Sequence, residues 1–300
     1  MIQSFIDFLK STGIYRLSQM ENWWQYLAMY VIIGVLFYLA IVKKFEPLLL
    51  LPIAFGMLLA NLPGANLIHL DFFFDDYYLA REMINPGEHA TMSMIIQEVI
   101  NNGGLLDILY LGVKLGIYPS LIFLGVGAMT DFTPLIANPK SLFMGAGAQL
   151  GVFAAFFFAL FLGFSPTEAG AIGIIGGADG PTAILVTKTL APHLLGAIAI
   201  AAYSYMALIP IIQPPFMKLL TTKKERAIKM TNLRNVSRVE KVIFPIIVSA
   251  IVCLLVPDAT ALVGFLMLGN LFNVSGVTDR LSKTAQNELC NIVTICLGVS

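Results

Sequence analysis

Long apolar runs separated by short polar breaks dominate the chain from residue 25 onward. Runs of this length are typical of helices that cross a lipid bilayer, because its hydrocarbon core takes about 20 consecutive apolar residues per helix. The pattern predicts an all-α, polytopic membrane protein. We predict crossings at 25–42, 45–62, 105–129, 142–164, 194–217, 242–257 and 260–274, with a last one starting near Leu289.

The first 24 residues have a different pattern. They lack the early basic region, apolar stretch and small-residue cleavage site of a signal peptide. Trp23 and Trp24 end the segment, and tryptophan concentrates at the level of the lipid headgroups. We expect 1–24 to be an interfacial helix, because its apolar residues recur at helical spacing beside charged ones: Ile2, Phe5, Ile6 and Leu9 beside Asp7 and Lys10.

Two polar connections carry opposite charge. Residues 64–103 contain six acids and one base, and residues 218–241 contain eight bases and two acids. Because basic residues concentrate on the cytoplasmic side, 218–241 is predicted to be a cytoplasmic loop. The acidic connection is interpreted only as a solvated loop.

The stretch 166–192 does not fit a simple crossing. Its two apolar parts, on either side of "GGADGPT" (176–182), are each about half a bilayer long at about 1.5 Å per residue. We therefore predict two half-helices that meet inside the membrane at Gly176–Gly180. If Lys43–Lys44 and the basic loop share one side, the stretch returns to the side it entered; if not, it crosses as a broken helix.

Two short stretches of the chain resemble each other, which suggests an internal repeat. "VGAMTD" (126–131) resembles "VSGVTD" (274–279), 148 residues later, and Ala137 matches Ala285 at the same offset. Many transporters are built from such repeats. We interpret 25–217 as a first transmembrane block and 242–300 as the start of a second, incomplete repeat. The last apolar run is short for a bilayer, so the chain is expected to be truncated.

The aspartate in the predicted break is the main candidate for chemistry. Gly176, Gly177 and Gly180 permit unusual backbone angles, and Pro181 suits the first turn of a new helix. Irregular backbone survives at membrane depth only where it lines a protein-buried or hydrated cavity. Asp179 either merely caps the second half-helix or binds an ion or proton, and the cost of burying a carboxylate in a membrane favours the second reading.

The atoms gathered there are hard oxygen ligands. The carboxylate, the freed carbonyl groups and the hydroxyls of Thr182 and Thr187 suit an alkali cation such as Na⁺ rather than a soft metal. The candidate Na⁺ site is thus Asp179, Gly176, Gly177, Gly180 and Thr182.

Other polar residues in apolar surroundings are weaker candidates. Tyr203 and Tyr205, with Ser204 between them, lie in the next span and either pack there or join the site. Lys188 and Lys114 are expected to extend toward the membrane surface. Asp131 and Asp279, each after a threonine, are interpreted as helix caps or loop anchors.

Composition narrows the class of protein. Hydrophobic residues make up 58% of the 300, charged residues 12%, and the net charge is zero. These values exclude a soluble enzyme and give no support to nucleic-acid binding. The three cysteines lack CxxC spacing and the three histidines are scattered, so neither set indicates a disulfide or a metal cluster.

Three motifs resemble one membrane family. "GIIGGADGPTAILV" (173–186), "MTDFTPLIANP" (129–139) and "NVSGVTDRLSKTAQNEL" (273–289) are similar to the β subunit of sodium-pumping, biotin-dependent decarboxylases. That family acts on oxaloacetate, methylmalonyl-CoA, glutaconyl-CoA or malonate. The resemblance covers nearly the whole chain from about residue 25, and the GGADGPT stretch is its most specific part.

The resemblance implies a function. Such a subunit decarboxylates carboxybiotin, consumes a proton and couples the reaction to Na⁺ export across the cell (inner) membrane. It implies that Asp179 is the essential aspartate and Tyr205 the functional tyrosine. It also implies partners: an α carboxyltransferase subunit, a biotin carrier, a small γ/δ subunit and further copies of the β subunit.

The resemblance further implies a fold of two related repeats with broken helices. A second set of ligands in the family, an asparagine, a serine and an arginine, falls beyond Ser300, so this chain alone is expected to be inactive. Two other readings stay open on the residues alone. One is a stand-alone Na⁺-coupled transporter or Na⁺/H⁺ exchanger without chemistry; the other is a non-functional or scaffold role for a truncated chain.

Overall fold

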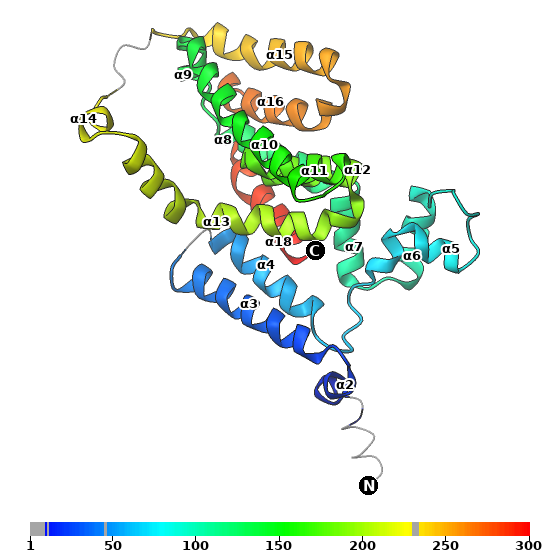
Figure 1. The fold of residues 1–300 in the computed structure, drawn as a ribbon. Coiled ribbons are helices and arrows are strands. Elements are labelled where there is room, and N and C mark those ends of the chain that lie inside the picture. The colour runs from blue at the N-terminus through cyan, green and yellow to red at the C-terminus, as the bar shows by residue number, and fades with distance from the viewer. Residues whose placement is uncertain (1–9, 11, 45–46, 230–233) are drawn as a thin grey trace. The chain divides into compact units, whose positions relative to one another are not determined.

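The computed structural model describes residues 10, 12–44, 47–229 and 234–300. Every regular element in these ranges is a helix, which confirms the all-α prediction (Figure 1). The residue contacts divide the chain into two units. The first comprises the chain up to Leu115 together with Ile295–Ser300, and the second is Gly116–Thr294.

The first unit contains a pair of apolar helices, α3 and α4, which pack against each other (Figure 1). Trp23 and Trp24 are the first residues of α3 and do not end the helix before it. The chain turns at 20–22, so the predicted interfacial helix 1–24 is not one continuous element; residues 1–9 and 11 lie outside the described ranges. The helices of this unit are α2 (Gly13–Gln19), α3 (Trp23–Ile41), α4 (Pro47–Ala60), η1 (Leu70–Phe73), α5 (Asp75–Ala80), α6 (Met92–Asn102) and α7 (Leu105–Lys114).

The acidic connection 64–103 is folded around buried charges. The fully buried carboxylate of Asp107 accepts a hydrogen bond from the backbone N–H of His69 (2.6 Å) and lies 2.8 Å from the His69 ring nitrogen. Lys114 was expected to extend toward the membrane surface. Instead its ammonium donates to the carbonyl oxygen of Phe73 at 2.5 Å and lies 5.6 Å from the centre of the Phe73 ring, because this segment covers it.

The second unit contains the remaining helices. In order they are α8 (Ile117–Met129), α9 (Thr133–Ala137), η2 (Pro139–Ser141), α10 (Leu142–Phe161), α11 (Pro166–Gly173), η3 (Ile174–Gly177), α12 (Gly180–Leu190), η4 (Pro192–Leu194), α13 (Leu195–Leu220), α14 (Lys223–Arg226), α15 (Arg238–Leu255), η5 (Pro257–Ala259), α16 (Thr260–Ser275), α17 (Asp279–Thr284), a π-helical turn η6 (Ala285–Leu289) and α18 (Cys290–Val299). The last five residues of α18 belong to the first unit.

The predicted crossing at 105–129 is wrong as a single helix. It is divided into α7 and α8 at Leu115–Gly116, where Gly116 has a φ of 78°. An L-residue with a side chain rarely adopts this left-handed angle, so the glycine allows the interruption.

Within the described residues, fewer helices than the eight predicted runs are both long and apolar enough to cross a bilayer alone. Among the described residues, three are long and apolar enough: Trp23–Ile41, Pro139–Phe161 and Pro257–Ser275; α7 and α8 give a fourth if the broken pair is one span. The length and apolar composition of these helices identify the chain as a membrane protein. On α10 the large side chains of Phe143, Phe157 and Phe161 are exposed, as expected of a surface that faces lipid.

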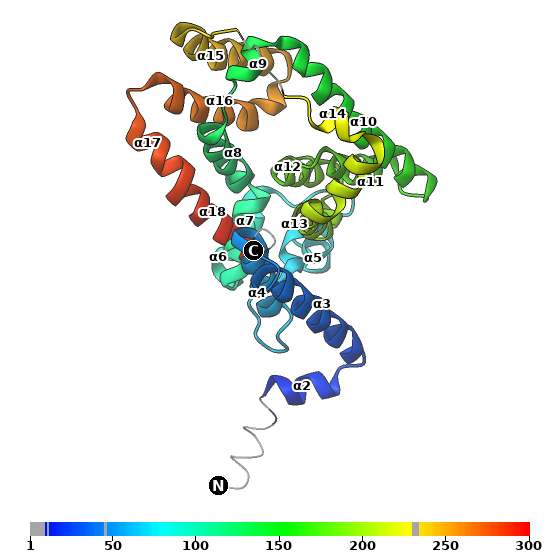
Figure 2. The same ribbon diagram turned by 90° about the vertical axis from the view of Figure 1, so that its left-hand side faces the viewer.

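The core of the second unit contains the packing of α8 against α16 (Figure 2). The amide of Asn270 on α16 donates to the carbonyl oxygen of Thr130 at 2.7 Å, and Gln286 donates to that of Ala128 at 2.8 Å. The amide of Asn270 is buried and that of Gln286 is half-buried. Both donate to carbonyl groups at the C-terminal end of α8, where no following helical turn supplies a backbone N–H.

Candidate functional site

The segment 166–192 is a helical hairpin. Its arms α11 and α12 pack side by side (Figure 1), and a β-carbon on Gly170 would lie 3.0 Å from Cδ1 of Leu190. At the open end Nε2 of His193 lies 2.9 Å from Oε1 of Glu168. The two ends of the hairpin therefore lie close together, as expected of the alternative in which the segment returns to the side it entered.

Local sequence explains where the first arm begins. The hydroxyl of Ser165 accepts a hydrogen bond from the backbone N–H of Glu168 (3.3 Å), and the Glu168 carboxylate accepts one from the N–H of Ser165 (2.9 Å). Pro166 occupies the first helical position. This capping box fixes the orientation of Glu168 toward His193. The pair was not expected, because the histidines are scattered in sequence.

The two arms are separated by irregular backbone, as predicted. The first arm ends in a 3₁₀ turn at Ile174–Gly177, and Ala178 has a left-handed φ of 57°. Asp179 is extended, and α12 starts at Gly180. The glycines were expected to supply the unusual angles. Ala178 adopts the left-handed angle instead, at a modest energetic cost for a residue with a β-carbon.

The glycines serve close packing. A β-carbon on Gly176 would lie 2.7 Å from the carbonyl oxygen of Gly151 on α10, and one on Gly173 would lie 3.0 Å from Cβ of Phe156. A side chain at either position would push the hairpin away from α10. Gly177 has more room, with its nearest neighbour, Val152, at 3.5 Å, and Gly180 is buried at the start of α12.

Asp179 occupies the N-cap position of α12, yet its side chain caps no backbone N–H there. Its half-buried carboxylate accepts a short hydrogen bond from the hydroxyl of Thr182. The simplest structural explanation, a side chain that caps the second half-helix, therefore does not describe this residue. The carboxylate and the hydroxyl form one oxygen cluster at the break.

Three consecutive carbonyl groups precede Asp179 in the irregular segment. Within the described ranges, no backbone N–H donates to the carbonyl oxygens of Gly176, Gly177 or Ala178, whereas the carbonyl of Asp179 accepts from the N–H of Ala183 at 3.0 Å. Carbonyls, a carboxylate and a hydroxyl are the ligand types that a hard monovalent cation prefers. The part of the chain that the structure describes contains no cluster of three His, Cys, Asp or Glu side chains for a transition metal.

Tyr205 comes from the next helix, α13. Its ring packs against the apolar cluster between α12 and α13, and its hydroxyl is close enough to Asp179 to interact electrostatically with the carboxylate. The side chains of Tyr203 and Ser204 lie outside the described residues. The structure therefore brings Tyr205 to the Asp179 region.

The remaining sequence candidates do not join Asp179. Thr187 follows it by two helical turns, about 12 Å along the helix axis, which is too far to share one coordination shell. The ammonium of Lys188 approaches the start of α8, 2.9 Å from where a β-carbon on Gly116 would lie. Asp131 anchors its loop by accepting the N–H of Thr133 at 2.9 Å, and Asp279 is the first residue of α17.

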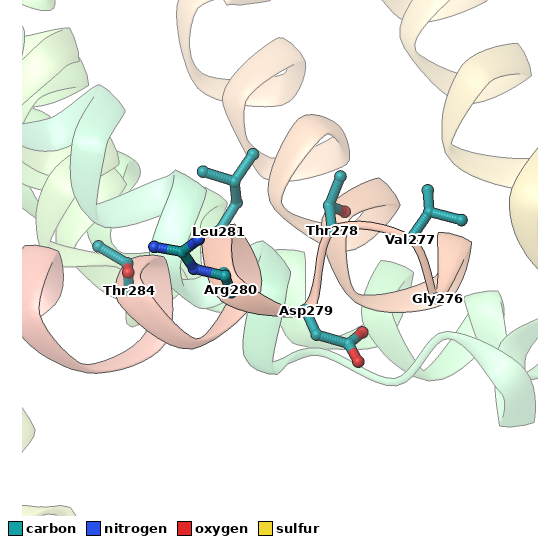
Figure 3. A pocket seen from close by; sticks show the side chains of 7 residues that line it. All are labelled: Gly276, Val277, Thr278, Asp279, Arg280, Leu281 and Thr284. Atoms are coloured by element: carbon teal, nitrogen blue, oxygen red, sulfur yellow. The ribbon is translucent and has the colours of Figure 1, made fainter.

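A separate depression of about 470 Å³ lies at the turn between α16 and α17 (Figure 3). The side chains of Asp279 and Arg280 point apart there. The depression is lined by residues of this turn and of α17: Gly276, Val277, Thr278, Asp279, Arg280, Leu281 and Thr284. None of these is a predicted Na⁺ ligand.

Apolar helices and a helical hairpin with oxygen atoms around one aspartate define a class of protein, the integral membrane ion transporters. The particular family follows from comparison with known proteins. The family model described as "Na+-transporting oxaloacetate decarboxylase beta subunit" matches residues 25–300, and the chain belongs to this family.

Three relatives illustrate the similarity. The methylmalonyl-CoA decarboxylase subunit beta of Propionigenium modestum is 53% identical over 100% of this chain and 73% of its own length. The glutaconyl-CoA decarboxylase subunit beta of Acidaminococcus fermentans is 53% identical over 92% of this chain and 65% of its own length. A probable oxaloacetate decarboxylase beta chain of Pasteurella multocida is 46% identical over 100% and 75%. The alignments thus span only about two-thirds to three-quarters of these relatives.

Proposed function

We propose that this chain is part of the membrane subunit of a decarboxylase sodium pump, which couples the decarboxylation of carboxybiotin to Na⁺ export. The residues around the hairpin break bind the exported Na⁺, with the carboxylate of Asp179 as the charged ligand. The hydroxyl of Thr182 and the carbonyl groups of Gly176, Gly177 and Ala178 supply neutral ligands, and Gly180 starts the helix that holds them.

One observation carries the proposal. Asp179 stands at a helix break without capping the helix, beside carbonyl groups that no described N–H occupies. A carboxylate used only for structure would satisfy the first turn of α12. The same residues lie within the part of the chain that matches the family of Na⁺-transporting decarboxylase subunits.

The coupling follows from charge balance on one carboxyl group. Na⁺ bound to Asp179 neutralises it, and the departure of Na⁺ leaves a partly buried charge that a proton can neutralise in turn. Carboxybiotin gives CO₂ and biotin only when a proton is taken up. If that proton comes from the Asp179 carboxyl, each decarboxylation frees the carboxylate for the next Na⁺.

The proposal includes the partners of such a pump. An α subunit transfers the carboxyl group to biotin, a carrier presents carboxybiotin at the membrane, and a small γ/δ subunit and further β subunits complete the assembly. The excess of basic residues in 218–241 supports a cytoplasmic position for this loop, where a biotin carrier would approach. Residues 230–233 of this loop lie outside the described ranges.

The test is the substitution Asp179→Asn in the assembled decarboxylase, with Asp258→Asn in the exposed turn η5 as the matched control. We expect Asp179→Asn to abolish both Na⁺ uptake into proteoliposomes and Na⁺-stimulated decarboxylation, while the control keeps both. Retention of either activity at the wild-type rate would remove Asp179 from the mechanism. Na⁺ transport without any biotin-carrying partner would instead identify a transporter without chemistry.

A further inference from the structure

Among the described residues, three buried hydroxyl groups have no hydrogen-bond partner. One is Oγ1 of Thr133 on α9; the other two are Oγ1 of Thr187, whose residue is fully buried, and the phenolic oxygen of Tyr205, on the successive helices α12 and α13. A hydroxyl that is removed from water without a partner destabilises the folded state. Such groups are rare in folded proteins and indicate ordered water or a functional constraint.

Thr187 lacks a hydrogen bond that three other hydroxyl residues in helices of this chain make. A helical serine or threonine commonly donates to the carbonyl four residues earlier. Thr189, two positions later on the same helix, does so to Leu185 at 3.3 Å, as do Ser120 and Ser249 to theirs at 2.9 and 2.7 Å. Thr187 makes no such bond, so its hydroxyl is directed away from the backbone of α12.

Both residues lie where α12 packs against α13. Ala183, Thr187 and Ala191 are four residues apart and therefore share one face of α12. Ala183 and Ala191 belong to the apolar cluster that also contains Ala202 of α13, and Tyr205 packs against the same cluster.

The same face of α12 extends toward Asp179, which precedes Ala183 by four residues. Tyr205 lies within electrostatic range of the Asp179 carboxylate. Thr187 is too far from Asp179 for a direct hydrogen bond. A polar connection between them therefore needs Tyr205 and at least one intermediate that can both donate and accept, which is what a water molecule does.

We propose that the hydroxyls of Thr187 and Tyr205 bind ordered water in the α12–α13 interface, and that this water is the route by which the Asp179 carboxyl exchanges its proton. The proposal rests on the proposed function. Along the route each group gives up one proton as it receives another, so no charge accumulates and no electrons move. Thr187 is a positioning residue, since it orients the water and does not touch the cation.

The experiment uses the assembled decarboxylase with Thr187→Val, which keeps the shape and removes the hydroxyl, and Thr187→Ser, which keeps the hydroxyl. Thr189→Val is the matched control, because its hydroxyl already bonds to its own helix. We expect Thr187→Val to slow Na⁺-coupled decarboxylation by about tenfold or more, within the range of lost proton-transfer catalysis. Its solvent deuterium isotope effect should rise, its half-saturating Na⁺ concentration should stay the same, and Thr187→Ser should restore the rate.

A second readout does not depend on activity. A high-resolution map of the complex should contain water density between the two hydroxyls, and Thr187→Val should remove it. If Thr187→Val behaves like Thr189→Val, or gains thermal stability with full activity, the hydroxyl is simply unpaired and the inference is overturned. A raised half-saturating Na⁺ concentration with an unchanged isotope effect would also overturn it, in favour of a cation ligand. An active Asp179→Asn variant would overturn the proposed function instead.

Discussion

Gly127 on α8 and Gly269 on α16 make reciprocal contacts at one helix crossing. A β-carbon on Gly127 would lie 1.9 Å from the carbonyl oxygen of Leu266, and one on Gly269 would lie 1.9 Å from that of Leu124. Each glycine follows the leucine of its own helix by three residues, so the two contacts have the same pattern.

Gly127→Ala or Gly269→Ala should therefore separate the two helices. Overpacking of a tight contact costs about 1–3 kcal/mol, so the midpoint of thermal unfolding in detergent should fall clearly. Gly264→Ala on the same helix is the control, because nothing lies within 4 Å of its β-carbon position. Equal midpoints for Gly269→Ala and Gly264→Ala would show that the crossing is looser than described.

Thr182→Val should weaken Na⁺ binding without removing the charge of the site. The hydroxyl of Thr182 donates a hydrogen bond to the Asp179 carboxylate and is a candidate ligand. A hydrogen bond to a charged group contributes about 1.5–3 kcal/mol, so the half-saturating Na⁺ concentration should rise about tenfold or more. Na⁺ titration of decarboxylation measures this. Thr182→Ser should stay close to the wild type, and a similar loss in both variants would argue for a packing defect.

Sequence patterns located the hairpin break because glycine, aspartate and proline together interrupt helix formation in an otherwise apolar stretch. They also located α10 and α16 to within a few residues, since polar breaks bound both runs. The interruption at Gly116 was missed, because one glycine between apolar residues looks the same in a straight helix as in a broken one.

Contacts between residues far apart in the sequence were not predicted, for a different reason. The carboxylate of Asp107 is paired with His69, 38 residues earlier, and Glu168 with His193, 25 residues later. Only the folded chain brings such partners together. The unpaired hydroxyl of Thr187 is equally invisible in sequence, where it has the same residue type as the back-bonded Thr189.

The folded acidic segment should lose stability at low pH. The hydrogen bond from the Tyr77 hydroxyl lowers the pKa of the Glu98 carboxyl below its usual value of 4.5, with further help from Asn102 and Arg81, while burial opposes the shift. A lowered folded-state pKa means that the stabilisation is fully present above pH 4.5 and is lost as the pH falls through the lower value.

Hydrogen exchange of 64–103 between pH 7 and pH 3, corrected for the intrinsic pH dependence of exchange, measures this loss. Glu98→Gln should reduce the protection at pH 7 and flatten its pH dependence, because the amide keeps the shape but not the charge. Glu82→Gln, at an exposed position of the same segment, should retain the wild-type profile. An unchanged pH profile in Glu98→Gln would assign the acid sensitivity to another group.

Single cysteines at the two ends of the hairpin should be labelled from the same side of the membrane. His193 contacts Glu168 across the open end, so residues 167 and 193 leave the membrane together. In a background without Cys253, Cys290 and Cys296, the variants Thr167→Cys and His193→Cys should react with an impermeant maleimide in the same vesicle orientation. Both starting positions are exposed, which favours access of the reagent. Labelling in opposite orientations would mean that 166–192 crosses the bilayer, and the oxygen cluster at Asp179 would then belong to a broken transmembrane helix rather than to the tip of a re-entrant hairpin.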